Sequence, residues 1–271
     1  MGSRSENVRV LVFSPVRPIL TNDMALQKIT TLLLDCDNTL VQSETLAFEA
    51  SADLTNEILA ARNVDLQFTG DQLEREFVGQ NFQTMMRSLE EKYKVSCSIS
   101  DKELEHYADM EDDRVISKLV QKLQPCEGAN SQLERLHGRY RLAVVSSSAL
   151  RRVRASLDKA QQAGFFSPSD VFSAADSLPL PTSKPDPAVY LHALGAMDKT
   201  AGECVAVEDS RSGATSANRA GIVTVGYTGA CKDSGEAEML RAVLVQAGCK
   251  LVMSSWAEFP GILQSIESGL V

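Results

Sequence analysis

Short apolar runs alternate with longer helical patterns along most of the chain, and this alternation restricts the fold more than any other feature. Six runs have strand character and stop at polar residues: 29–34, 142–145, 171–174, 204–207, 222–225 and 251–253. Strands that alternate with helices form parallel sheets with helices on both faces. The sequence therefore predicts an α/β fold, in which the carboxyl ends of the strands share one edge and form the ligand site.

One long segment interrupts this alternation between the first and second runs. From residue 44 to about 123 the chain is rich in Glu, Leu, Met and Ala at helical spacing and has no strand pattern. Pro125 and Gly128 mark the return to the sheet. We expect a helical domain over 44–126, inserted into an α/β core made of 28–43 and 127–271. Because the insert leaves the chain beside the ligand edge, we expect it to cover the site as a lid.

Composition limits the kinds of partner. Lys and Arg total 27 against 36 Asp and Glu, a net charge of −9, so no broad cationic face for nucleic acid is expected. No apolar run approaches the roughly 20 residues of a membrane span. Six cysteines without C-x-x-C spacing indicate free thiols. We expect a cytoplasmic monomer that binds neither nucleic acid nor membranes. Residues 1–27 are predicted to be a poorly ordered extension, since Glu6 and Asp23 argue against a transit segment.

The first run is followed by Asp35-Cys36-Asp37-Asn38-Thr39-Leu40. Two carboxylates two residues apart at a strand end fit either an Asp/Asn-rich turn or a functional site. A calcium-binding loop is excluded, because it needs Gly where Leu40 stands. Taken alone, this motif leaves the turn and the site as equal alternatives.

The second run leads into Ser146-Ser147-Ser148, and a helical pattern then continues to Gly164. Ser148 is expected to be the N-cap of this helix. The same geometry presents backbone N–H groups and a hydroxyl to an anion. By itself the motif favours the capping role.

Two further signals follow later strands. Pro185 holds Lys184 in an extended conformation, and Asp186 as N-cap with Pro187 at the first helical position predicts the next helix start. The fourth run ends in Glu208 and Asp209. Acid pairs at the ends of two strands indicate a hard cation bound by oxygen ligands.

These four motifs, in this order and each at a strand end, resemble those of the haloacid dehalogenase-like hydrolases, specifically the phosphatase and phosphomutase branch with a helical cap. The resemblance covers nearly everything from residue 29 to the C-terminus. It implies a Rossmann-like parallel sheet with an inserted all-helical cap. Asn38 departs from the pattern, since many members have Gly there, but Asn can still form the turn.

The resemblance implies a role for each motif residue. Asp35 would attack phosphorus and become an aspartyl phosphate. Asp37 would protonate the leaving alkoxide and then accept a proton from the attacking water. Ser146, the N–H of Ser147 and Lys184 would hold the phosphoryl oxygens.

The resemblance also implies bound Mg²⁺. Its ligands would be the Asp35 carboxylate, the Asp37 backbone carbonyl and Asp209. Glu208 would be a further ligand or a supporting partner of the others.

A mutase of the same fold is the main alternative. Sugar-phosphate mutases of this family carry an Arg in the cap and a His twelve residues after the nucleophile, and here those places hold Phe82 and Ala47. Asp37 argues against dehalogenation, which needs no acid for a leaving alkoxide. A catalytically inactive scaffold protein is disfavoured because every catalytic position is filled.

The sequence therefore predicts a Mg²⁺-dependent phosphatase acting on a small phosphorylated metabolite, such as a sugar, polyol or glycolate phosphate. Five residues are candidates to contact its leaving group: Glu44, Gln80, Asn81, Phe82 and Arg87.

Overall fold

The computed structural model describes residues 28–270, so the predicted extension 1–27 lies outside the described residues. It contains one sheet in the order β3-β2-β1-β4-β5-β6, and every neighbouring pair is parallel. The predicted α/β parallel-sheet fold is thus confirmed. The strands are β1 (Thr31–Leu34), β2 (Arg141–Ser146), β3 (Val171–Ser173), β4 (Cys204–Glu208), β5 (Val223–Tyr227) and β6 (Leu251–Met253).

Ten α-helices accompany the described strands. Four lie between β1 and β2: α1 (Glu44–Ala61), α2 (Gly70–Phe77), α3 (Phe82–Tyr93) and α4 (Asp101–Lys122). The others are α5 (Ala129–Leu136), α6 (Leu150–Lys159), α7 (Ala188–Met197), α8 (Arg211–Arg219), α9 (Ser234–Gln246) and α10 (Phe259–Glu267). Short 3₁₀ turns are η1 (Ala163–Phe165), η2 (Pro168–Asp170), η3 (Ala201–Glu203) and η4 (Trp256–Glu258). None of the helices described is long and apolar enough to cross a membrane.

Different helices cover the two faces of the sheet, as the side chains of β1 illustrate. Leu32 and Leu34 pack with apolar residues of α5, α6 and α10, whereas Leu33 packs with residues of α7 and α8. Successive side chains of a strand point to opposite faces, and a central parallel strand is buried on both. The continuous apolar sequence of β1 follows from this position.

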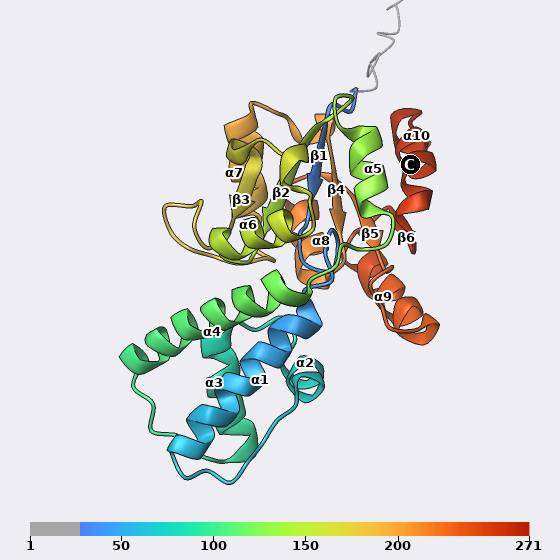
Figure 1. Cartoon of the computed structure of the whole chain (residues 1–271). Coiled ribbons are helices and arrows are strands. Elements are labelled where there is room, and N and C mark those ends of the chain that lie inside the picture. Colours follow the sequence, from blue (N-terminus) through green and yellow to red (C-terminus); the bar gives the residue numbers. More distant parts are fainter. Residues whose placement is uncertain (1–27, 271) are drawn as a thin grey trace, which may run out of the picture.

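Helices α1–α4, which we call the helical module, lie beyond the carboxyl ends of the strands (Figure 1). The module has its own apolar core, built from residues such as Leu59, Leu73 and Met85. Val115 and Leu119 of α4 belong instead to the apolar cluster that includes β1. Apolar packing therefore runs from the sheet into the module, and α4 joins the two parts.

The start and end of α6 differ from the sequence prediction. Ser148 is not the N-cap: Ala149 precedes the helix, and the N–H of Leu150 donates to Asp176 at 2.6 Å. Asp176 comes from the loop after β3, so tertiary structure supplies the acceptor that we assigned to Ser148. The helix ends at Lys159, and Gly164 lies in η1.

Candidate active site

The carboxyl ends of the three central strands bring the predicted residues together. Leu34 of β1 is in register with Val144 of β2 on one side and with Val207 of β4 on the other. Asp35 directly follows β1, while Ser146 and Glu208 end β2 and β4. Three polar residues that are distant in sequence therefore meet at one edge of the sheet.

Lys184 connects two of these strand ends. Its ammonium donates to Asp35 Oδ1 at 2.6 Å, to Glu208 Oε1 at 2.6 Å and to the Val145 carbonyl at 2.8 Å. Burial alone would lower the pKa of Lys184, but the charges of Asp35 and Glu208 outweigh burial and raise it. Lys184 is therefore a permanently charged, buried cation. The Lys184–Pro185 peptide bond is cis.

Glu208 is fully buried and serves as the anchor of this lysine. Its Oε1 also accepts a hydrogen bond from Tyr190 at 2.5 Å. Its Oε2 has no hydrogen-bond partner among the described residues and lies against Gly213, where an added Cβ would approach to 1.7 Å. Only glycine leaves room at position 213 for this buried carboxylate.

Three carboxylates form a candidate metal site. Oxygen atoms of Asp35, Glu208 and Asp209 lie within 4.8 Å of one another. When all three are ionised, Lys184 leaves two negative charges uncompensated. Burial raises the pKa of Asp35 to about 8, although Lys184 opposes the shift, and burial also raises that of Asp209 well above its usual value. An all-oxygen donor set with this excess charge fits a hard divalent cation such as Mg²⁺.

Asp37 has different surroundings. Ser43 donates to its Oδ1, Ser148 donates to its Oδ2 at 2.7 Å, and a guanidinium nitrogen of Arg152 lies 3.6 Å from Oδ1. Burial opposes ionisation, but Arg152 and the two hydroxyls outweigh it and lower the pKa of Asp37. Sequence reasoning missed Ser43 and Arg152 and gave Ser148 another role, because nothing in the motif spacing shows that they converge on Asp37.

The turn after β1 depends on Asn38. Its φ of +53° lies in the left-handed region, which Gly adopts freely and which Asn tolerates better than most residues. The Asn38 side chain donates to Glu44 Oε2 at 2.6 Å. A glycine would allow the same turn but would not hold Glu44.

These groups open into one cavity of about 800 Å³ between the sheet edge and the helical module. Ten of the twelve predicted site residues line it: Asp35, Asp37, Glu44, Gln80, Asn81, Phe82, Ser146, Ser147, Lys184 and Asp209. Glu208 lies behind Lys184 and not on the cavity wall.

The prediction that Arg87 contacts the leaving group is wrong. Its guanidinium pairs with Glu90 at 3.1 Å and Asp101 at 2.8 Å, outside the cavity wall. Asn81 lines the cavity, but its side-chain oxygen caps α3 by accepting from Thr84. Helical spacing alone could not show which side chains of α3 face the cavity and which face Asp101.

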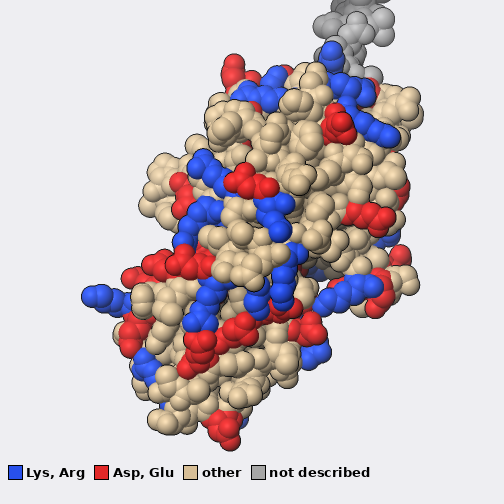
Figure 2. Space-filling model, viewed as in Figure 1, with Lys and Arg blue, Asp and Glu red and all other residues tan. Residues whose placement is uncertain are grey.

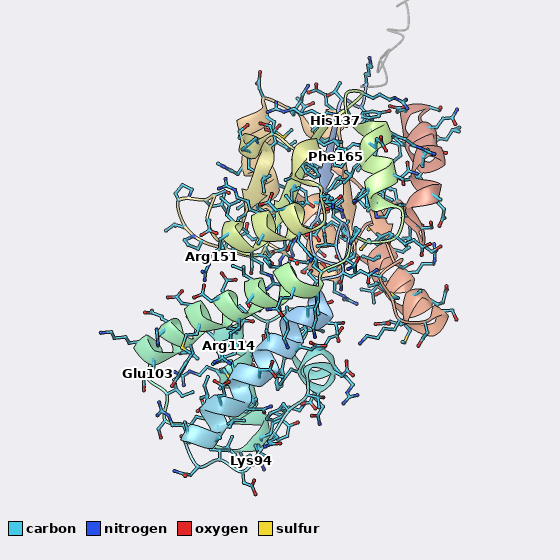
Figure 3. The ribbon with its side chains drawn as sticks, in the orientation of Figure 1. Lys94, Glu103, Arg114, His137, Arg151 and Phe165 are labelled. Atoms are coloured by element: carbon cyan, nitrogen blue, oxygen red, sulfur yellow. The ribbon has the colours of Figure 1, made fainter. Side chains whose placement is uncertain are left out.

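Ion pairs cross the boundary between the module and the core. Arg151 of α6, which is labelled in Figure 3, pairs with Asp112 of α4 at 2.5 Å and also with Asp113. Lys232 pairs with Glu74 of α2 at 3.1 Å. Acidic and basic side chains intermingle over the face in Figure 2, most densely near this boundary. The module is thus held over the cavity by apolar contacts and by exposed ion pairs, which are individually weak.

Comparison with known proteins gives a consistent result. The family model described as haloacid dehalogenase-like hydrolase matches residues 29–221. The chain is 26% identical to the 6-phosphogluconate phosphatase of Escherichia coli (strain K12) over 197 residues, which is 73% of this chain and 81% of that protein.

Solved structures show the same fold. A haloacid dehalogenase-like protein from Agrobacterium tumefaciens superposes with a TM-score of 0.70 at 23% identity, covering 88% of this chain and 99% of that one. CbbY from Rhodobacter sphaeroides, solved in complex with phosphate, superposes with a TM-score of 0.67 at 22% identity. The match covers 85% of this chain and 96% of that one.

Proposed function

We propose that this chain, which belongs to the haloacid dehalogenase-like hydrolases, is a Mg²⁺-dependent phosphatase that hydrolyses a small phosphorylated metabolite through an aspartyl phosphate. The observation that carries the proposal is the placement of Asp35 and Asp37 in one cavity with Lys184 bonded to Asp35. The E. coli relative is itself named a phosphatase of a sugar-acid phosphate. Sugar, polyol and glycolate phosphates are all small enough for a cavity of about 800 Å³.

In the proposed reaction an Asp35 oxygen attacks phosphorus, and the bond from phosphorus to the leaving oxygen breaks. Lys184 balances the charge on the phosphoryl oxygens, and the hydroxyl of Ser146 and the N–H of Ser147 donate hydrogen bonds to them. Asp37 donates a proton to the leaving alkoxide and then accepts one from the water that attacks the aspartyl phosphate. An arriving phosphate dianion adds negative charge beside Asp37, which raises the pKa of this carboxyl and favours its proton-donating form.

The carboxylates of Asp35 and Asp209 would hold Mg²⁺, with Glu208 fixing the lysine beside them. When bound, Mg²⁺ supplies positive charge that offsets the repulsion between these carboxylates and the phosphate. The helical module, residues 44–126 in our proposed division of the chain, would act as the lid that limits access of water.

A phosphatase is favoured over a sugar phosphomutase by the wall of the cavity. Phe82 and Ala47, which replace the Arg and His of such mutases, both line the cavity. No Lys or Arg of the module is among the described lining residues. A bisphosphate intermediate would therefore find no cation in the module to hold its distal phosphate.

The decisive experiment measures phosphate release from a panel of phosphorylated metabolites with Mg²⁺, with EDTA, and with the Asp35→Asn variant. We expect turnover that needs the metal and that disappears in Asp35→Asn, because an amide oxygen is too weak a nucleophile. The Asp158→Asn variant makes the same chemical change at an exposed site outside the cavity and should retain turnover. Wild-type turnover by Asp35→Asn would refute the covalent route.

The mutase alternative is tested by phosphorus NMR on β-glucose 1-phosphate with a trace of the bisphosphate. A phosphatase yields inorganic phosphate and glucose. Faster accumulation of glucose 6-phosphate than of inorganic phosphate would replace the phosphatase assignment with a mutase.

A further inference from the structure

We propose that the site selects phosphate esters whose leaving group carries no second anionic group, and that neutral polyol phosphates are its preferred class. This inference rests on the proposed phosphatase function and narrows the substrate class. It excludes substrates such as phosphoglycolate and sugar-acid phosphates as preferred substrates. The selectivity follows from the charges that surround the part of the cavity occupied by the leaving group.

Every charged residue that the helical module contributes to the cavity wall is acidic. These residues are Glu44 of α1 and Asp109, Glu111 and Asp112 of α4. Asp112 is matched by Arg151 at 2.5 Å, but Glu44 and Glu111 are hydrogen-bonded only to neutral groups among the described residues. Burial raises the pKa of Glu44 to about 7 and also raises that of Glu111, so this partly buried part of the wall already disfavours negative charge. Above the pKa of Glu44, a second anion on the leaving group would meet a like charge that is weakly screened.

Two of these acids are fixed in place and are not free to turn away. Asn38 donates to Glu44 at 2.6 Å, and Ser51 donates to Glu111 at 2.5 Å. Both carboxylates are therefore part of a defined wall. The turn residue Asn38 thus has a second role that a glycine could not fill.

The cations of the described cavity wall are Lys184 and Arg152, and both lie beside the catalytic carboxyls of the core and not in the helical module. Lys184 is bonded to Asp35 and Glu208 and faces the transferring phosphoryl group. A guanidinium nitrogen of Arg152 lies 3.6 Å from Asp37 Oδ1, and the Arg152 Nε has no hydrogen-bond partner among the described residues. Its positive charge is already opposed by three acids, Asp37, Glu111 and Asp112. A carboxylate on the substrate would have to compete with acids that are already present.

The rest of the wall suits a neutral, hydroxyl-bearing chain. The module supplies the amides of Gln80 and Gln83 and the hydroxyl of Ser51, and Phe48 and Phe82 add aromatic surface. Amides and hydroxyls can donate to or accept from alcohols. Aromatic rings can pack on the CH groups of a polyol.

The test compares two esters that differ at one carbon. Glucitol 6-phosphate ends in a CH₂OH group where 6-phosphogluconate has a carboxylate. At a pH well above 7, where Glu44 is ionised, both compete with p-nitrophenyl phosphate for the wild-type enzyme with Mg²⁺ present, and the inhibition constant of each is measured. We expect the inhibition constant of 6-phosphogluconate to be at least tenfold higher than that of glucitol 6-phosphate. Equal constants, tighter binding of 6-phosphogluconate, or no competition by either ester would overturn the proposal.

Two variants connect the selectivity to the wall. Glu44→Gln and Glu111→Gln keep the shape and hydrogen-bonding ability of each side chain but remove its charge. Each variant should lower the ratio of the inhibition constant of 6-phosphogluconate to that of glucitol 6-phosphate by about threefold or more. Glu105→Gln makes the same change on α4 at an exposed residue outside the cavity wall and should leave the ratio unchanged. If both wall variants kept the wild-type ratio, the acidic wall would not be the cause.

The controls separate this inference from the proposed function. If the enzyme hydrolysed neither p-nitrophenyl phosphate nor any metabolite of the wider panel, the phosphatase assignment itself would be wrong. Hydrolysis with a preference for 6-phosphogluconate would keep the phosphatase assignment and remove the inference.

Discussion

Asp35 and Asp37 lie two residues apart, yet their surroundings shift their pKa values in opposite directions. Burial raises the pKa of Asp35 to about 8 against the opposing charge of Lys184. Arg152, Ser43 and Ser148 overcome burial and lower the pKa of Asp37. Unequal surroundings of two neighbouring carboxyls are typical of sites that give them different roles. Asp35 is one of the carboxyls of the candidate metal site, whereas Asp37 accepts hydrogen bonds from the hydroxyls of Ser43 and Ser148.

The Asp37→Asn variant should lower kcat for an alkyl phosphate by about 10² to 10⁴, the usual contribution of general acid–base catalysis. The loss should be smaller with p-nitrophenyl phosphate, because its leaving group departs without needing a proton. Steady-state kinetics on both esters measure the difference. Asp158→Asn, at an exposed position of α6, is the matched control. Equal losses on the two esters would argue against proton donation by Asp37.

Gly213→Ala should lower the free energy of unfolding by about 1–3 kcal/mol, since the added methyl group overlaps buried Glu208. It should also reduce turnover, because Glu208 must move and Lys184 loses its anchor. Gly195→Ala in α7 is the control: its Cβ meets no atom within 4 Å, so it should stabilise by about 0.5–1 kcal/mol. Urea unfolding measures both. A Gly213→Ala protein as stable as the wild type would show that Glu208 moves freely.

At this scale most of the site residues predicted from the sequence line the cavity, but the sequence does not predict the contacts that position them. Asp35, Ser146 and Glu208 are found because parallel strands present their ends at one edge. The contacts of Ser43, Ser148 and Arg152 with Asp37 depend on side-chain directions in separate elements. Spacing within a motif carries no information about such directions.

At the scale of elements, all six strands were predicted from apolar runs, because strands buried on both faces have continuous apolar sequences. Helix boundaries were less predictable where the caps come from distant residues. Helix α7 begins at Ala188 with Pro187 at the N-cap, one residue later than predicted. The difference is small because Asp186 still accepts the N–H of Ala188 at 2.8 Å from within the same segment. The α6 prediction failed because its acceptor, Asp176, comes from another loop.

Asp176→Ala should therefore lower the free energy of unfolding by about 0.5–2 kcal/mol, the usual cost of losing a helix cap. Ser148→Ala should have a smaller effect on stability and instead lower activity, because Ser148 donates to Asp37. Chemical denaturation and kinetics on both variants distinguish the two roles. If Ser148→Ala cost as much stability as Asp176→Ala and left activity intact, Ser148 would be the structural residue after all.

At the scale of the molecule, the cavity lies between two parts whose sequences are far apart. The alternation of strands and helices locates the insert, and its position after β1 predicts that it covers the site. The charge of the wall was not predictable, because helical periodicity leaves open which acidic residues of α4 face the cavity and which face solvent. Glu111 lines the cavity while Asp113 on the same helix is exposed.

The buried carboxyls couple the stability of the whole protein to pH and to metal. The pKa of Asp35 rises from 3.8 to about 8 on folding, and that of Asp209 also rises. Between these pH values Asp35 and Asp209 bind more protons in the folded protein than in the unfolded chain, so their contribution to stability is greatest at low pH and falls as pH rises toward 8. A divalent cation can replace these protons, because its positive charge also relieves the repulsion between the carboxylates of Asp35 and Asp209.

Mg²⁺ should therefore raise the melting temperature of chelator-treated protein more at pH 8 than at pH 5.5. At the lower pH protons already neutralise Asp35 and Asp209, and the cation must displace them. Thermal unfolding with and without Mg²⁺ at each pH gives the difference directly, because titration elsewhere in the chain affects both samples alike. The Asp209→Asn variant should show a smaller Mg²⁺ effect at pH 8. An equal effect of Mg²⁺ at the two pH values would mean that these carboxyls are not where the metal and the protons compete.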